Sequence, residues 1–162
     1  MPRSCMLAPM RVIDEVDVQL LRMLQQDGRI TNADLAKAVN LSPPSVLQRV
    51  RALERAGLIK GYAAILDAEK LGLRITAFAM ISLSLHQDMP IERFRKAIQG
   101  VEEVQECYHI SGEYDFLLKI NVRDMRAYET LIREKISRIK GIRQINSSFV
   151  FGVPKQTTAI PL

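Results

Sequence analysis

The sequence predicts an α+β protein in which an N-terminal winged helix-turn-helix domain is followed by a ferredoxin-like βαββαβ domain. Three observations predict this arrangement. Apolar residues recur at helical spacing in three stretches before Gly57. Between the second and third stretches lie residues that favour a tight turn and a helix cap. After Asp67 the pattern changes to alternating strands interrupted by two helical stretches, in the order β-α-β-β-α-β.

The first helix is expected to end near Gly28 and to form the third wall of a small N-terminal core. Its apolar face consists of Ile13, Val16, Leu20 and Leu24. We place the domain that it opens at residues 12–62. Residues 1–11 lack the long apolar stretch of a signal peptide and are expected to form a flexible tail.

The next two helices form the helix-turn-helix. The first is expected over Thr31–Val39. Asn40 follows where the chain must turn left-handed, a conformation that Asn tolerates better than most residues. Ser42 is placed to cap the next helix, and Pro43 falls at its first position, where a missing N–H costs nothing.

The second of these helices presents a basic outer face. Val46, Val50 and Leu53 form its apolar stripe, so the residues between them point outward. Gln can read adenine, Arg can read guanine or hold a phosphate, and Ser can contact either. The residues that we expect to contact DNA are Pro44, Ser45, Gln48, Arg49, Arg51 and Arg55. The alternative is an ordinary solvated face, but the capped turn and the partner helix favour DNA binding.

The segment after this helix is rich in β-prone residues. Gly57–Asp67 is expected to form a small wing or a strand that leaves the domain, and we assign residues 63–75 as a linker strand.

The second half, residues 76–162, is expected to form a four-stranded antiparallel sheet with two helices on one face. The Gly112-Glu113 pair is a hairpin turn signal, and Asp124 is placed to cap the second helix. The expected strands are 76–85, 104–111, 114–122 and 142–150, and the expected helices are 91–98 and 125–139.

Such a sheet leaves one face without helices. We assign to that face the apolar residues Phe78, Met80, Phe116, Leu118, Phe149 and Phe151. They are too apolar to be left in water, so a partner subunit is expected to cover them.

Composition agrees with a DNA-binding protein of ordinary globular type. The chain has 162 residues, 48% of them apolar, which argues for a buried core and against disorder. The net charge of +5 is a mild excess, as expected of a protein that touches DNA through one face. Two distant cysteines favour free thiols in a reducing cytosol. No stretch of about 18 consecutive apolar residues predicts a membrane span.

Three stretches carry a family resemblance: DGRITNADLAKAVNLSP at 27–43, RALERAGLIKGY at 51–62 and SGEYDFLLKINVRDMRAYE at 111–129. Together they resemble the Lrp/AsnC-type, or feast/famine, transcription regulators. The resemblance implies an N-terminal DNA-binding domain and a C-terminal amino-acid-sensing domain. It also implies a homodimer built on the C-terminal sheets, often assembled into tetramers or octamers, with the amino acid held at a cleft between C-terminal domains.

The resemblance places the effector loop on Gly112, Glu113, Tyr114 and Asp115, with polar residues of the last strand near Asn146, Ser147 and Ser148. A zwitterionic amino acid needs acceptors for its ammonium group, which Glu113 and Asp115 offer. It also needs donors for its carboxylate, which backbone N–H groups of the turn and Ser147 or Ser148 offer. The alternative is a tight hairpin with solvated acids.

Enzyme and metal chemistry receive little support. Cys107 and His109 are too few for a metal site, which needs three or four ligands. Glu113 and Asp115 have no nucleophile or phosphate-binding loop beside them. We therefore expect no enzyme and no cofactor, but a sequence-specific transcription regulator that senses a small amino acid in the cytoplasm, on the nucleoid. The alternative is a nucleoid-style architectural protein that binds DNA broadly; an operator preference that resists salt separates the two.

Overall fold

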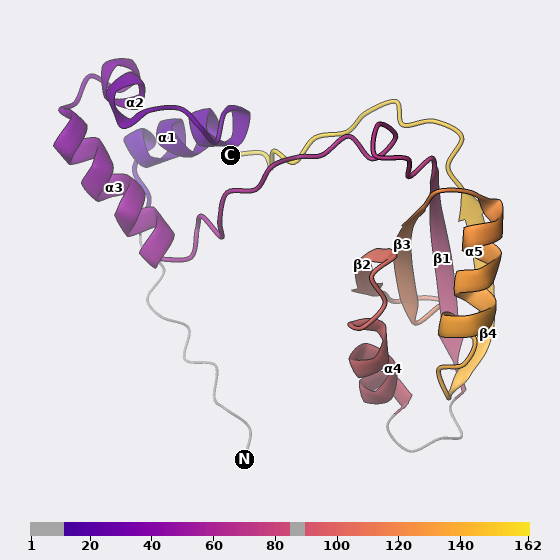
Figure 1. Ribbon diagram of the computed structural model, residues 1–162. Coiled ribbons are helices and arrows are strands. Elements are labelled where there is room, and N and C mark those ends of the chain that lie inside the picture. Colours follow the sequence, from indigo (N-terminus) through magenta and orange to yellow (C-terminus); the bar gives the residue numbers. More distant parts are fainter. Residues whose placement is uncertain (1–11, 85–89) are drawn as a thin grey trace, which may run out of the picture. The chain divides into compact units, whose positions relative to one another are not determined.

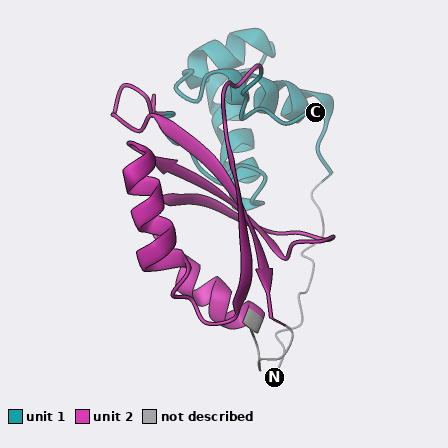
Figure 2. Cartoon of the chain, turned by 90° about the vertical axis from the view of Figure 1, so that its right-hand side faces the viewer, with its two compact units in different colours: residues 1–65, 155–162 teal, residues 66–154 magenta. Residues whose placement is uncertain are grey.

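The computed structural model describes residues 12–84 and 90–162, so the tail expected at 1–11 lies outside the described residues. The chain divides into two compact units (Figures 1 and 2). Of the described residues, the first contains 12–65 together with 155–162, and the second contains 66–84 and 90–154. Residues 155–162 thus cluster with the N-terminal unit, whereas the sequence predicts a C-terminal domain over residues 76–162.

The described part of the first unit forms three helices: α1 (Glu15–Gln26), α2 (Asn32–Ala38) and α3 (Pro43–Arg55). Each begins at a side-chain cap, in which Asp14, Thr31 or Ser42 accepts from a backbone N–H three residues later. Asn40 adopts the expected left-handed conformation, with φ of 53°. The apolar faces of the helices meet in a core that contains Leu20, Leu35, Ala36, Val46 and Val50. The helix-turn-helix prediction is confirmed in its helices, caps and turn.

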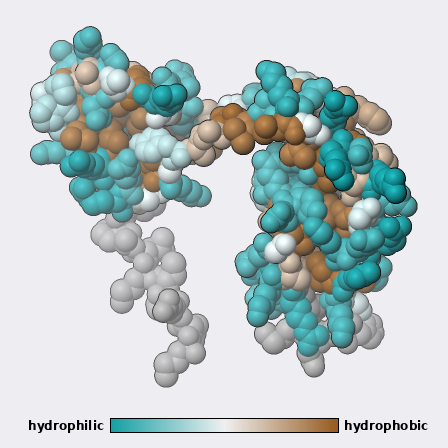
Figure 3. Space-filling view, viewed as in Figure 1, coloured by the Kyte–Doolittle hydropathy of each residue, from teal (hydrophilic) through white to brown (hydrophobic). Residues whose placement is uncertain are grey.

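The segment between α3 and the first strand differs from the prediction. All of residues 56–74 are described, and none of them is in a strand. No strand forms over Gly57–Asp67, where a small wing or a strand was expected, and of the linker strand expected over 63–75 only Ile75 is in a strand. Ile65 and Leu66 are 76% and 70% exposed, and apolar atoms mark this connecting segment in the space-filling view (Figure 3). β-prone residues form a strand only against a neighbouring strand, and this segment has none.

The second unit has the predicted βαββαβ order. Its elements are β1 (Ile75–Leu83), α4 (Pro90–Ile98), β2 (Val104–His109), β3 (Phe116–Val122), α5 (Met125–Leu131), η1 (Ile132–Ile136) and β4 (Ile142–Phe149). The strands form one antiparallel sheet in the order β2-β3-β1-β4. Where the sequence predicts one α-helix over 125–139, the structure has α5 followed by the π-helical turn η1, in which the Ser137 N–H donates to the Ile132 carbonyl.

The core of this unit lies between the sheet and its helices. Ala77, Ala79 and Ile81 of β1 face Phe94 of α4 and Leu131 of the α5 end. All five residues are buried, and the first four have no exposed surface.

Three of the six residues assigned to the helix-free face lie on the helix side instead. Phe116 and Leu118 are buried in the core, and Phe149 packs against the same cluster. The cause is the register: Ala79 pairs with Leu118, so odd residues of β1 share a face with even residues of β3. Phe78 and Met80 do lie on the face opposite the helices, where Met80 pairs with Leu117 of β3. Phe151 follows β4 and is fully exposed.

Candidate DNA-binding face and effector loop

Several side chains on the outer face of α3 are exposed and make no polar contact within the described part of the chain. They are Gln48, Arg51 and Arg55, whose side chains have no hydrogen bond or ion pair with any residue that the structure describes. Pro44 and Ser45 are exposed in the first turn. The reverse face is held by Val46, Val50 and Leu53, all buried. Five of the six expected DNA contacts are thus presented outward by a helix that is fixed from behind.

Ser45 is partly engaged by the helix cap. Its hydroxyl lies 2.8 Å from the Ser42 hydroxyl, and its backbone N–H donates to the Ser42 Oγ at 3.4 Å. A hydroxyl both donates and accepts, so Ser45 retains capacity for a phosphate or a base.

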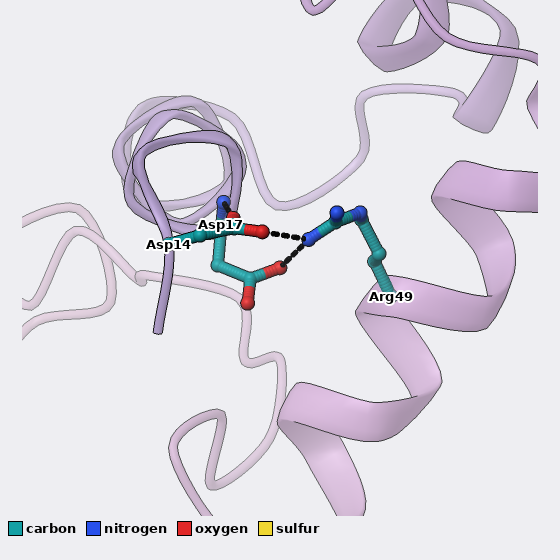
Figure 4. A network of polar contacts seen from close by, with 3 residues as sticks. All are labelled: Asp14, Asp17 and Arg49. Atoms are coloured by element: carbon teal, nitrogen blue, oxygen red, sulfur yellow. Dashed lines mark hydrogen bonds and ion pairs between the residues drawn. The ribbon is translucent and has the colours of Figure 1, made fainter. Parts of the chain in front are cut away.

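Arg49, the sixth expected DNA contact, is engaged inside the protein. Its Nη1 donates to Asp14 Oδ2 at 2.7 Å and to Asp17 Oδ1 at 2.9 Å (Figure 4). Asp17 is only 1% exposed, and its own N–H donates to Asp14 Oδ1 at 2.8 Å. Arg49 therefore joins the middle of α3 to the start of α1, and its charge is already neutralised by two carboxylates. We name Asp14, Asp17 and Arg49 the α1–α3 anchor.

The ionisation of the anchor follows from these contacts. The Asp17 backbone N–H, together with the Arg49 guanidinium, holds the pKa of the Asp14 carboxyl below its ordinary value. Hydrogen bonds to Asp14 and Asp17 raise the pKa of Arg49. Asp14 and Arg49 are therefore both charged at neutral pH. An Asp-x-x-Asp pair at a helix start, followed by an Arg on the third helix, was the signal of the anchor in the sequence.

The expected effector loop joins β2 to β3. Gly112 has φ of 116°, a conformation that side chains disfavour, so glycine is required there. Asp115 fixes the loop to β1: its N–H donates to the Ile81 carbonyl at 2.8 Å, and its Oδ2 accepts from the Leu83 N–H at 2.7 Å. One oxygen of this expected ammonium acceptor is thus used by the fold, whereas Glu113 is exposed beside it.

The last strand brings one of its expected polar residues, Asn146, to this loop. Asn146 Nδ2 donates to the Tyr114 hydroxyl at 3.1 Å. Ser148 lies on the same face of β4 as Asn146, opposite Phe78. These residues and the loop share the sheet face that carries no helix.

Ser147 is on the other face and is not brought to the loop. It pairs with Ala79 in the sheet, and its Oγ accepts from the Tyr128 hydroxyl at 2.6 Å on the helix side. Burial raises the pKa of Tyr128, so this donor stays protonated. Neighbouring residues of a strand point to opposite faces, so Ser147 and Ser148 cannot serve one site on a single chain. Ser147 is therefore not brought to the effector loop within one chain, and its expected effector role stays a prediction.

A cationic cleft of about 400 Å³ lies elsewhere in this unit, on the helix side of the sheet. It is lined by Arg93, Ala97, Val101, Lys135, Arg138, Ile139 and Lys140, and by none of the expected effector residues. The described residues contain no group of three or more His, Cys, Asp or Glu side chains that could hold a metal ion. None of the helices in the described ranges is long and apolar enough to cross a membrane.

Comparison with known families identifies both units. Residues 13–60 match a winged helix-turn-helix DNA-binding model, and residues 76–160 match the Lrp/AsnC ligand binding domain. The leucine-responsive regulatory proteins of Escherichia coli (strain K12) and Klebsiella pneumoniae are each 40% identical to this chain over 152 residues, covering 94% of it and 93% of the relative.

Solved structures agree with these matches. A transcriptional regulator from Neisseria meningitidis, solved as a complex with L-Met, has a TM-score of 0.89 at 34% identity and covers 93% of this chain and 97% of its own. AsnC of Escherichia coli has a TM-score of 0.85 at 28% identity, covering 93% and 99%. With a helix-turn-helix that presents a basic face and a βαββαβ domain that matches the family's ligand-binding module, this chain belongs to the Lrp/AsnC family of DNA-binding transcription regulators.

Proposed function

We propose that this chain reads duplex DNA through the outer face of α3 and changes its DNA binding when an amino acid occupies the β2–β3 loop region. The observation that carries the proposal is the contrast on α3. Gln48, Arg51 and Arg55 are free and exposed, while the reverse face and Arg49 fix the helix to α1.

The residues of α3 divide by chemistry. A guanidinium on the helix flank holds a phosphate, whereas the Gln48 amide can pair with adenine in the major groove. Pro44 and Ser45 lie in the first turn, the part of a recognition helix that approaches the bases. Arg49 contributes by orienting α3.

The DNA proposal is tested with the double variant R51A/R55A in gel-shift titrations over a range of salt. Each phosphate contact that is lost should lower the slope of log K against log salt by about 0.9, at every DNA sequence. The double variant R123A/R126A removes the same charge from exposed positions in the other unit and is the matched control. An R51A/R55A protein with unchanged affinity and slope would contradict the proposal.

For the effector we propose a site built from Gly112, Glu113 and Tyr114 of the loop, with Asn146 and Ser148 of β4. Glu113 offers a carboxylate for the ammonium group, and backbone N–H groups and the Asn146 amide offer donors for the carboxylate. Asp115 shapes the loop and has one oxygen left for the ligand. The Neisseria relative, solved with L-Met, supports an amino acid as the ligand class.

The effector proposal is tested by a thermal-shift screen of the twenty amino acids, because a ligand of the native state raises its stability. Calorimetry then compares Glu113→Gln with Glu129→Gln, an exposed glutamate on α5. For the amino acid with the largest shift, Glu113→Gln should weaken binding by about tenfold, the loss of one charge-assisted hydrogen bond. Equal affinities in the two variants would place the site elsewhere.

We further propose that the protein acts as a homo-oligomer on the nucleoid in the cytoplasm, assembled through the helix-free sheet face around Phe78, Met80 and Leu117. A second candidate function, broad architectural DNA binding, shares the basic helix. Competition between an operator and random duplex at rising salt separates the two. Non-specific binding collapses as salt rises, whereas operator preference survives.

A further inference from the structure

The segment that follows the ligand-binding domain is part of the DNA-binding unit. Residues 155–162 cluster with the three N-terminal helices, and the C-terminal end of the chain lies beside α1 (Figure 1). The chain therefore passes between the two units twice, once near residue 65 and once near residue 154. Each ligand-binding domain has two covalent connections to a DNA-binding unit.

The contact with α1 is made through the peptide backbone. The Ile160 N–H donates to Gln25 Oε1 at 2.7 Å, and Gln25 Nε2 donates to the Ile160 carbonyl at 3.2 Å. The Arg22 guanidinium donates to the Leu162 carbonyl. Arg22 and Gln25 are three residues apart and share one helix face. The side-chain amide of Gln25 thus pairs with both the backbone N–H and the carbonyl of Ile160, as a neighbouring strand would.

The contact buries little apolar surface. Ile160 is 66% exposed and Leu162 is 42% exposed. Backbone hydrogen bonds with little burial make a weak attachment that can open locally without unfolding the unit. A contact of this kind is suited to reversible docking.

The helix that receives the segment is the helix that positions α3. Asp14 and Asp17, at the start of α1, hold Arg49 of α3, while Arg22 and Gln25, in its second half, hold the segment. α1 is a single helix of twelve residues, so its two contact sites are rigidly connected. A continuous series of contacts leads from residues 160–162 to the recognition helix.

We propose that the face of α1 formed by Arg22 and Gln25 is a docking surface for residues 157–162 of this chain, and that the docked segment couples the ligand-binding domain to α3. The coupling rests on the proposed function. An amino acid that favours one arrangement of the ligand-binding domain changes how residues 155–162 reach α1, and so shifts the docked population. DNA that favours the docked unit shifts amino-acid affinity by the same factor.

The experiment uses the full chain and two variants of neighbouring glutamines. Gln25→Ala removes the receptor for Ile160, whereas Gln26→Ala, at an exposed position, is the matched control. A third protein lacks residues 157–162. Deuterium uptake followed by mass spectrometry reports docking directly. Peptides covering 157–162 should exchange faster in Gln25→Ala than in Gln26→Ala and the unaltered chain. Equal uptake in Gln25→Ala, Gln26→Ala and the unaltered chain would overturn the docking surface.

Coupling is measured as the change in DNA Kd that an amino acid causes, with L-leucine and L-methionine as the first probes and the other eighteen after them. Allosteric factors are typically about 5–150-fold. Gln25→Ala and the shortened chain should still bind DNA and the amino acid, but the factor should fall to about one, because docking no longer links the two binding events. Gln26→Ala should retain it.

The two failures are distinguishable. A factor that survives in Gln25→Ala and in the shortened chain contradicts the coupling role and leaves the proposed function standing. An unaltered chain whose DNA Kd responds to none of the twenty amino acids contradicts both the coupling and amino-acid sensing.

Discussion

Single side chains decide how α3 is used. Arg49 and Arg51 are two residues apart on a basic helix, and in the sequence both are candidate DNA contacts. In the structure Arg49 bonds to Asp14 and to the almost fully buried Asp17, while Arg51 is exposed. A guanidinium that satisfies a buried carboxylate stabilises the fold, and a free one is available to a phosphate.

Replacing these two arginines should therefore have opposite consequences. Arg49→Ala takes the cation from a buried carboxylate and should lower the free energy of unfolding by about 1–3 kcal/mol. Arg51→Ala should change it by about 0.5 kcal/mol or less while weakening DNA binding. Urea denaturation and gel-shift titration of both variants measure the two effects. An Arg49→Ala protein as stable as Arg51→Ala would refute the structural role of the anchor.

The anchor also predicts a pH dependence. The pKa of Asp14 in the folded state lies below the ordinary value of 3.8, because of the Asp17 N–H and the charged Arg49, with Asp17 facing the same guanidinium. The stability from this shift is fully present above the unfolded pKa and is lost as pH falls through the folded one.

Asp14→Asn keeps the helix cap, since Asn caps as well as Asp, but cannot ionise. Melting temperatures measured between about pH 6 and pH 2.5 should therefore fall more steeply for the unaltered chain than for Asp14→Asn. Parallel curves would show that the Asp14 charge adds nothing to stability.

At the scale of elements, the helices are determined by residues close in sequence, whereas the strands depend on pairing between distant segments. The turn between α2 and α3 depends on Asn40, whose φ of 53° is open to few residues. In the sheet, the register of β1 against β3 decided which apolar residues entered the core. The alternation of side chains along β1 does not show which of its faces is buried, because both faces carry apolar residues.

The Asn40 turn offers a matched pair of substitutions. Asn40→Gly should leave the stability of the N-terminal unit nearly unchanged, because glycine adopts the left-handed conformation freely. Asn40→Ala should destabilise it by about 1 kcal/mol, the cost of placing an ordinary side chain there. Thermal denaturation of the two variants measures the difference, and equal melting temperatures would show that the turn relaxes to another conformation.

At the scale of the whole molecule, the helix-free sheet face predicts self-association. Phe78, Met80 and Leu117 are only partly buried on that face within one chain. Apolar side chains at the centre of a sheet face are stabilised by a covering partner, and a closed homodimer provides one.

A charge on this face should disrupt the oligomer. Met80→Glu places an unpaired carboxylate in the proposed interface, so the mass in solution should fall toward the 18.4 kDa of one chain. Arg126→Glu, exposed on α5, changes charge away from that face and should leave the mass unaltered. Sedimentation equilibrium at micromolar concentration tests both variants; a Met80→Glu protein with the mass of the unaltered chain would rule out this interface.

The sequence by itself determined the order of the elements, the caps at Ser42 and Asp124, the left-handed turn at Asn40 and the outward face of α3. These features depend on interactions between residues a few positions apart in the sequence. Residue propensity and apolar periodicity therefore predict them. The comparisons confirmed the family that the motifs resembled. The roles of the individual site residues stay predictions.

Only the tertiary structure decided which residues meet across the chain. The partners of Arg49 lie 35 and 32 residues away, and Gln25 meets Ile160 at a separation of 135 residues. The absence of a strand over 63–74 and the separation of Ser147 from the effector loop likewise follow from which segments become neighbours. Periodicity shows that a residue faces inward or outward but carries no information about the distant partner, because that partner is selected by the packing of the whole unit.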